Sequence, residues 1–138
     1  MSTDGHCPFC HLPENWVWLT SASCVAFFDG YPVAKGHALV IPRRHVASLF
    51  DLSAEEFAEA WSLVSQVRAA LVERVHPDAF NVGWNDGPVA GQTVSHAHIH
   101  VIPRKNGDVT DPRGGIRWVI PGKANDAFPE RFKVLGAQ

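Results

Sequence analysis

The sequence predicts an α+β fold, with a mainly antiparallel sheet of about five strands and one long helix. Five short runs are rich in β-branched and aromatic residues, and one amphipathic run separates the third from the fourth. The order strand, strand, strand, helix, strand, strand is typical of a helix that covers one face of an antiparallel sheet. With 138 residues the chain is long enough to bury a core. We therefore expect residues 1–138 to form a single domain, with an N-terminal segment (1–15) and a C-terminal tail (105–138).

The predicted strands are apolar runs bounded by turn residues. The first ends before a Ser/Thr-rich segment, the second before a loop with glycine and proline, and Pro42 ends the third. The fourth alternates in polarity, and the fifth contains the histidines at 96, 98 and 100. A late short strand is expected at 116–121. The first four ranges are 16–19, 24–29, 37–42 and 79–85.

The predicted helix begins near residue 53 and ends near Val75. Ser53 and Glu56 have the spacing of a capping box, and Pro77 disfavours helical geometry at the residue before it. Apolar residues recur at helical spacing and predict the buried stripe. They are Phe57, Trp61, Val64, Val67, Leu71 and Val75.

Three of the eight histidines, His96, His98 and His100, alternate in one short run. On a regular strand their side chains share one face, and the outer two lie about 13 Å apart. That distance predicts different roles for His96 and His100. The residues between them, Ala97, Ile99 and Val101, predict a core face.

Composition limits the classes of partner. A net charge of −2 argues against broad binding to a nucleic-acid backbone but permits a local phosphate site. No run of about 18 apolar residues predicts a transmembrane helix, and Met1–His6 does not resemble a secretory signal. We therefore expect a cytoplasmic protein with no membrane partner. Three cysteines, an odd number, fit such a compartment.

Four separated segments, in order, resemble the histidine triad (HIT) superfamily. The run 96–102 matches its His-x-His-x-His-x-x pattern, and 36–45 resembles its Gly-His-φ-Leu-Val-φ-Pro segment. Residues 85–87 and 91–94 resemble two loop segments between these. Within the superfamily the chain looks most like bacterial hydrolases of the diadenosine-polyphosphate type. The resemblance implies a HIT-like fold, a homodimer and a nucleotide substrate, without an organic cofactor.

The resemblance also implies a reaction at an α-phosphorus through a covalent nucleotidyl-histidine. By motif position the nucleophile is His98, and His37 and His100 flank the phosphate. Neutral imidazole, with a pKa of about 6.5, has the lone pair that attack at pH 7 requires. The implied substrate contacts are Asp29, Asn85, Gln92 and Thr93. Dinucleoside polyphosphates are the leading substrates; nucleoside phosphoramidates and nucleotide binding with little catalysis are the alternatives.

Cys7 and Cys10 have the spacing of half a tetrahedral zinc site. His45 and His96 are the candidate partners, as in similar bacterial HIT proteins, and His6 and His11 are rivals. Such a zinc would be structural, because four protein ligands leave no open position. Cys-Pro-Phe-Cys also resembles a glutaredoxin motif, but no strand is predicted before it, so a redox role is disfavoured. A metal-hydrolase site that includes His96 and His98 is a further alternative.

Overall fold

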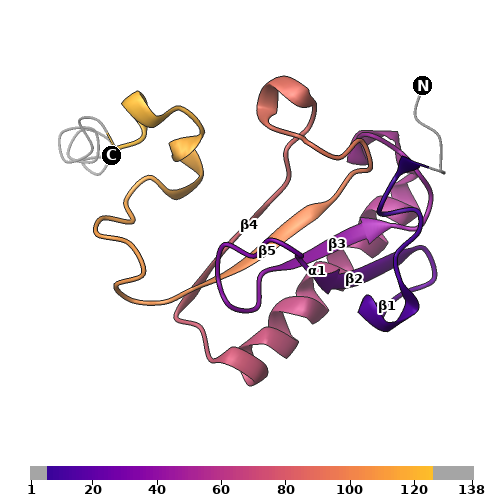
Figure 1. Ribbon diagram of the computed structural model, residues 1–138, viewed down its shortest axis with the longest axis horizontal. Helices are drawn as coiled ribbons and strands as arrows, with labels where there is room; N and C mark the ends of the chain where they lie inside the picture. Colours follow the sequence, from indigo (N-terminus) through magenta and orange to yellow (C-terminus); the bar gives the residue numbers. More distant parts are fainter. Residues whose placement is uncertain (1–5, 126–138) are drawn as a thin grey trace. The chain divides into compact units, whose positions relative to one another are not determined.

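The computed structural model describes residues 6–125, and its centre is a five-stranded antiparallel sheet (Figure 1). The strands pair in the order β1-β2-β3-β5-β4, so the histidine-bearing strand β5 lies between β3 and β4. This arrangement, with one long helix, confirms the predicted α+β class. The strands are β1 (Val17–Thr20), β2 (Cys24–Phe28), β3 (Ala38–Pro42), β4 (Ala79–Gly83) and β5 (Ile99–Arg104).

The helix α1 (Ala54–Val75) begins and ends as the sequence predicts. The Ser53 hydroxyl accepts from the Glu56 amide, and the Glu56 carboxylate accepts from the Ser53 amide, which completes the capping box. A hydrogen bond from Arg44, followed by the one from the Ser53 amide, lowers the pKa of Glu56 to about 2. His76 caps the other end in the left-handed conformation, with φ of 51°.

The buried stripe of α1 differs in part from the predicted one. Val64, Val67 and Leu71 are buried as expected, but the other three residues of the predicted stripe are only partly buried: Phe57, Trp61 and Val75. Ala60 and Leu63 take their place at the centre of the interface. Both lie on the side of the helix that faces the sheet, where a small residue allows close approach.

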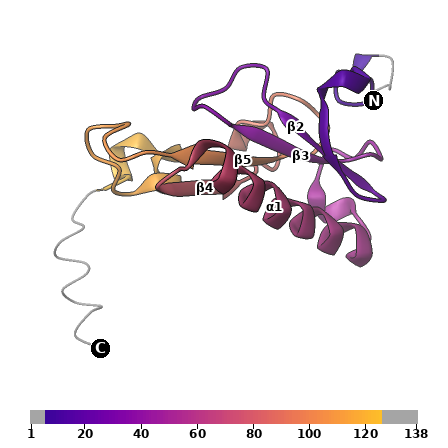
Figure 2. The ribbon, with the colours of Figure 1, turned by 90° about the horizontal axis from the view of Figure 1, so that it is seen from below.

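The helix α1 covers one face of the sheet (Figure 2), and apolar side chains are buried on both faces of the sheet. Alternate residues of β2, β3 and β5 face α1 and form the larger core. The intervening residues form a second, smaller core that the N-terminal segment covers with Phe9, Leu12 and Val17. The smaller core consists of Val25, Phe27, Leu39 and Ile41.

The chain divides by its contacts into two compact units, residues 1–105 and 106–138. In the second unit the strand expected at 116–121 is absent from the described residues, which instead form 3-10 turns at Gly115–Val119 and Pro121–Lys123. Arg113 pairs with Asp111, and Arg117 donates to the carbonyls of Lys123 and Ala124. The predicted tail extends beyond the described residues. No helix among residues 6–125 has the length and apolar character that crossing a bilayer requires.

Candidate functional site

The histidine run does not form one regular strand. β5 begins at Ile99, so only His100 lies within it; His96 lies in a bend, and His98 lies in the irregular segment between that bend and the strand. The amide of Ala97 donates to the Val46 carbonyl at 2.7 Å, so the loop after β3 holds this bend. The prediction of one regular strand through all three histidines is therefore wrong. The three rings still adjoin one another, because Phe9 meets the rings of His96 and His98, and the His98 ring meets that of His100. The predicted core face is confirmed, because Ala97, Ile99 and Val101 are all buried.

The strand register places His100 on the sheet face opposite α1. His100 lies beside Leu39 of β3 on one side and Gly83 of β4 on the other. Leu39 belongs to the smaller core, whereas Ile99 and Val101 belong to the core beneath the helix. The imidazole of His100 therefore stands over the face that the helix leaves uncovered.

Asp29, His37 and His100 form a compact set, which we call the aspartate–histidine group. Nε2 of His37 lies 2.9 Å from Nδ1 of His100 and 3.4 Å from an Asp29 carboxylate oxygen. Asp29 follows β2 directly, and the Asp29 amide donates to the His37 carbonyl just before β3. The β2–β3 hairpin and β5 thus bring together three residues that are distant in sequence.

The hydrogen bonds of this group fix the direction of its protons. Nδ1 of His37 accepts from the main-chain amide of Val33 at 3.1 Å. A neutral imidazole has one N–H, so the proton of His37 is on Nε2 and donates to Nδ1 of His100. The single proton of His100 is then on Nε2. His100 therefore presents an N–H donor away from His37.

His98 is in the opposite tautomer to His100, with its proton on Nδ1 rather than on Nε2. Its Nδ1 lies 2.8 Å from the main-chain carbonyl of His96 and donates to it. The proton of the neutral ring is used there, so Nε2 has a free lone pair. The His98 and His100 rings lie 5.1 Å apart between centroids, edge to face. A lone pair and an N–H donor therefore stand side by side.

Burial keeps the imidazoles of His37 and His100 neutral. Desolvation lowers the pKa of His37 from its ordinary value, against the opposing effect of the Asp29 charge. Desolvation, followed by the charges of His98 and His37, lowers the pKa of His100 to about 4. At pH 7 the two rings carry one proton each, as the directed hydrogen bonds require.

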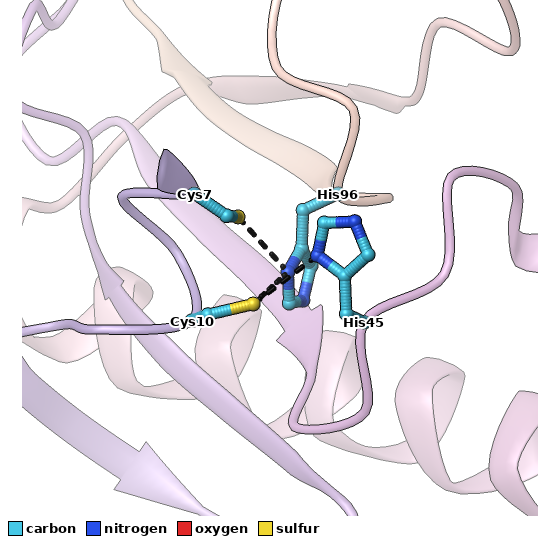
Figure 3. Close-up of side chains that lie close together, drawn as sticks. All are labelled: Cys7, Cys10, His45 and His96. Carbon is cyan, nitrogen blue, oxygen red and sulfur yellow. Dashed lines mark hydrogen bonds between the residues drawn. The ribbon is translucent and has the colours of Figure 1, made fainter. Parts of the chain in front are cut away.

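A second set, Cys7, Cys10, His45 and His96, converges from three segments of the chain (Figure 3). We call it the cysteine–histidine cluster. Its sulfur and ring nitrogen atoms all lie within 4.8 Å of one another. Nδ1 of His96 lies 3.5 Å from Sγ of Cys7 and 3.6 Å from Sγ of Cys10. Nδ1 of His45 lies 3.1 Å from Sγ of Cys10. His6 and His11, the rival ligands, are exposed and lie outside the cluster.

The geometry and tautomers of this cluster fit a metal ion. Tetrahedral zinc with ordinary Zn–S and Zn–N bonds separates sulfur from nitrogen by about 3.6 Å. Nε2 of His96 donates to the Pro42 carbonyl at 2.7 Å, which leaves the Nδ1 lone pair directed at the two sulfur atoms. A histidine ligand whose second nitrogen donates to a carbonyl is the ordinary arrangement at metal sites. The cluster is therefore a candidate metal-binding site.

The cysteine motif lies in a different context from a redox motif. Cys7–Cys10 forms a turn, closed by the Cys10 amide on the Cys7 carbonyl at 3.2 Å. No strand precedes it among the described residues, and a 3-10 turn at Glu14–Trp16 follows it. The helix N-terminus that lowers a thiol pKa in redox motifs is missing from this part of the chain.

The remaining predicted substrate contacts lie in the loop after β4. The Gln92 side-chain amide makes hydrogen bonds within the protein. Its nitrogen donates to the Ala47 and Val94 carbonyls, and its oxygen accepts from the Gly87 amide. Gln92 therefore joins three loop segments. Thr93 is exposed, and the Asn85 side chain lies beside Gly91. A pocket of about 270 Å³ borders this loop. It is lined by Ala47, Ser48, Asp86, Gly87, Pro88, Gln92 and Ser95.

Two contacts at the site were not predicted from the sequence. The ring of Phe9, between the two cysteines, meets the His98 ring edge to face at 5.1 Å. It also meets Phe27 at 5.4 Å, so the N-terminal segment supports the His98 ring from the smaller core. The Val33 amide is the second. The position of Phe9 between two cysteines could have indicated a contact near the site. A main-chain donor in a loop has no sequence pattern from which it could be predicted.

Comparison with known proteins gives consistent results. The sequence model of the HIT domain family matches residues 13–107. The chain is 35% identical to adenosine 5'-monophosphoramidase hnt1 of Schizosaccharomyces pombe, over 96% of this chain and 94% of that protein. It is 38% identical to bis(5'-adenosyl)-triphosphatase of Dictyostelium discoideum, over 70% of this chain and 65% of that protein. A zinc-bound histidine triad family protein from Mycobacterium smegmatis superposes with a TM-score of 0.70 at 29% identity, covering 96% of this chain and 99% of that one.

Proposed function

The chain belongs to the HIT family, and from that premise we propose that it hydrolyses nucleotides at an α-phosphorus through a nucleotidyl-histidine on His98. One observation carries the proposal. His98 presents a lone pair on Nε2 beside an Nε2–H donor of His100, and the hydrogen bonds of the chain itself set both polarities. Attack on a phosphate ester needs a nucleophile and a donor to the phosphate oxygens, side by side.

In the first step the His98 Nε2 lone pair forms a bond to the α-phosphorus, and the bond to the leaving group breaks. The electron pair of that bond departs with the leaving group. The imidazole then carries phosphorus on Nε2 and a proton on Nδ1, so it bears a positive charge. The His96 carbonyl accepts from that Nδ1–H and stabilises the charge.

In the second step the oxygen of water forms a bond to the same phosphorus and the water releases one proton to solvent. The phosphorus–nitrogen bond breaks, and its electron pair returns to Nε2 of His98. The Nε2–H of His100 donates to a phosphate oxygen throughout, and the His37 Nε2–H bonded to His100 polarises that donor. Loss of one such donor costs about 10²–10³-fold in rate. Asp29, Asn85 and Thr93 are proposed to contact the nucleotide. Gln92 is proposed to hold the adjoining loops, with its pocket beside the leaving group.

The leading substrates are dinucleoside polyphosphates, because the D. discoideum relative is named a bis(5'-adenosyl)-triphosphatase. Adenosine phosphoramidates are the second candidate. Coverage is the observation that supports this second candidate, because this chain and the monophosphoramidase hnt1 match almost end to end, whereas this chain spans 65% of the triphosphatase.

A substrate panel tests the proposal. Purified protein would be given diadenosine tetraphosphate, diadenosine triphosphate and adenosine phosphoramidate, followed by alkaline quenching and mass spectrometry of histidine peptides. We expect turnover of at least one substrate and a nucleotidyl adduct on the peptide with His98. His98→Ala should remove both, and His11→Ala, a change at an exposed histidine, should remove neither. Full activity in His98→Ala would disprove the covalent mechanism. AMP binding without turnover would favour a regulatory nucleotide-binding protein.

We further propose that the cysteine–histidine cluster binds zinc. The M. smegmatis neighbour is described as zinc-bound, and two thiolates with two imidazoles suit this ion. With four protein ligands the zinc supplies stability rather than reactivity. It would join the N-terminal segment to the loop after β3 and to the bend before β5, beside His98.

Assembly and domain organisation are also proposals. We propose a homodimer, and the outer edge of β4, the last strand of the sheet, is a candidate contact. Sedimentation of the full chain would give its mass. We propose one HIT domain whose whole active site lies within residues 1–105, where every candidate site residue is found. The cytoplasmic location and the lack of a nucleic-acid partner stay predictions.

A further inference from the structure

The loop between β2 and β3 exposes side chains to solvent, whereas its main-chain amides donate hydrogen bonds. The side chains of Tyr31 and Val33 are 92% and 73% exposed. At the start of the loop the Tyr31 amide donates to the Asp29 carboxylate at 2.8 Å. At its end the His37 amide donates to the Ala34 carbonyl at 3.1 Å. The path of the loop is therefore set by main-chain bonds rather than by side-chain packing.

The C-terminal end of the loop, at Gly36, is also restrained by close contacts with α1 and β5. Gly36 has φ of +87°, and a Cβ there would meet Leu71 of α1 at 3.2 Å and Pro103 of β5 at 3.3 Å. Only glycine combines this conformation with so close an approach. The loop thus returns to β3 along one path, which holds the amide of Val33 against the His37 ring.

That amide is the first donor in a directed chain. It donates to Nδ1 of His37, which obliges the His37 proton to occupy Nε2, and that proton then donates to Nδ1 of His100. The Asp29 carboxylate favours the same tautomer, but its oxygen is 3.4 Å from Nε2, beyond the usual range of an N–H···O bond. The Val33 amide, at 3.1 Å, is the closer constraint on the ring.

We propose that the main-chain amide of Val33 is a positioning group for the reaction, which acts through His37 to fix the Nε2–H donor of His100. The inference rests on the proposed function for its catalytic consequence. Its structural part, the tautomer of two histidines, stands on the hydrogen bonds alone. The Val33 side chain has no part in it, because that side chain points into solvent.

Proline and alanine at position 33 separate the amide from the side chain. Val33→Pro removes the N–H, whereas Val33→Ala keeps it. Nitrogen-15 NMR of the histidine rings would report each tautomer, and steady-state kinetics on the best substrate of the panel would report kcat and KM. We expect Val33→Ala to keep the wild-type tautomers of His37 and His100. We expect Val33→Pro to populate the other tautomer in both rings.

In Val33→Pro we expect kcat to fall at least about tenfold. The loss should be smaller than the roughly 10²–10³-fold typical of deleting a donor, because His100 is still present. KM should change less, because the nucleotide contacts remain. Unchanged tautomers in this variant would overturn the proposal. Changed tautomers with an unchanged kcat would overturn its catalytic part.

Because proline also restricts φ, a second variant removes the N–H alone. Replacing the peptide bond between residues 32 and 33 with an ester, by semisynthesis, leaves the side chain in place and puts an oxygen at the donor position. The same tautomer change is expected. A wild-type pattern in the ester variant would overturn the proposal even if proline had disturbed the loop. If the wild-type chain turns over no nucleotide, the proposed function fails while the NMR comparison still decides this inference.

Discussion

The cysteine–histidine cluster and the aspartate–histidine group both bring their potential ligand atoms within 4.8 Å of one another. They differ in where the protons point. In the first, Nε2 of His96 donates outward to Pro42, and the Nδ1 lone pair faces the sulfur atoms. In the second, Nδ1 of His37 accepts from a main-chain amide, and an N–H faces inward toward His100.

This difference shows that proximity alone does not define a metal site. A neutral imidazole that accepts at one nitrogen has a proton on the other, so His37 has no second lone pair for an ion. The main-chain partner of each ring decides between metal binding and proton donation. The metal-hydrolase alternative is disfavoured because Nδ1 of His96 is directed at the sulfur atoms of Cys7 and Cys10, while Nδ1 of His98 donates to a carbonyl.

The largest expected effect comes from Cys10→Ser, which tests the metal role of the first cluster. Structural zinc contributes directly to folding free energy, so we expect loss of about one zinc per chain and a fall in Tm of about 10 °C. Metal analysis and calorimetry would measure both. Cys24→Ser, at a buried cysteine outside the cluster, is the control and should keep its zinc. Full zinc content in Cys10→Ser would rule out the proposed ligand set.

His100→Ala is the complementary change in the second group. It removes the donor to the phosphate, so kcat should fall about 10²–10³-fold. Zinc content should be the same as in the wild type, because His100 lies outside the first cluster. Kinetics and metal analysis on one preparation would test the separation, and zinc loss in this variant would contradict it.

Acid should lower the free energy of unfolding, because His100 of the aspartate–histidine group is protonated more readily in the unfolded chain than in the fold. The pKa of His100 is about 4 in the fold and about 6.5 in the unfolded chain. A depressed folded pKa means that the stabilising contribution is complete above pH 6.5 and is lost as the pH falls toward 4. Allowing for partial solvent exposure, about 1–2 kcal/mol is involved. Urea unfolding of wild type and His100→Ala at pH 7 and pH 4.5 should show a smaller pH effect in the variant; equal effects would argue against the shift.

The smallest effect is expected at Phe9, which lies between the two regions. Phe9→Leu keeps an apolar side chain but loses the edge-to-face contact with His98, worth about 0.5–1.5 kcal/mol. We expect kcat to fall about two- to tenfold with zinc retained. Phe50→Leu, at an exposed phenylalanine, should leave kcat unchanged. Loss of zinc in Phe9→Leu would show that the two regions are not independent.

The sequence predicts the scaffold better than it predicts the site. The helix ends at 53 and 75 follow from local capping and from Pro77, which need no tertiary information. The core face of Ile99 and Val101 follows from alternation. Strand pairing stops just before them, because the amide of Ala97 bonds to the loop after β3 instead of to a strand.

The separate environments of His96 and His100 were predicted from a distance along a regular strand that does not exist there. In the structure His96 lies in a bend before the strand and His100 lies within β5, so the expectation of two environments holds while its premise does not. Ring tautomers were beyond prediction, because they depend on carbonyls and amides that only the folded chain brings near. The strand expected at 116–121 is likewise replaced by 3-10 turns, in a region with glycines at 114 and 115.

The hydrogen bond from residue 33 has a consequence for how such sites vary during evolution. A main-chain amide is supplied by every amino acid except proline, so side chains at this exposed position are free to diverge while the donor persists. Selection at this position would appear as the absence of proline among related sequences rather than as one conserved residue. A search for invariant letters would overlook this position, whereas a search for positions that never hold proline would find it.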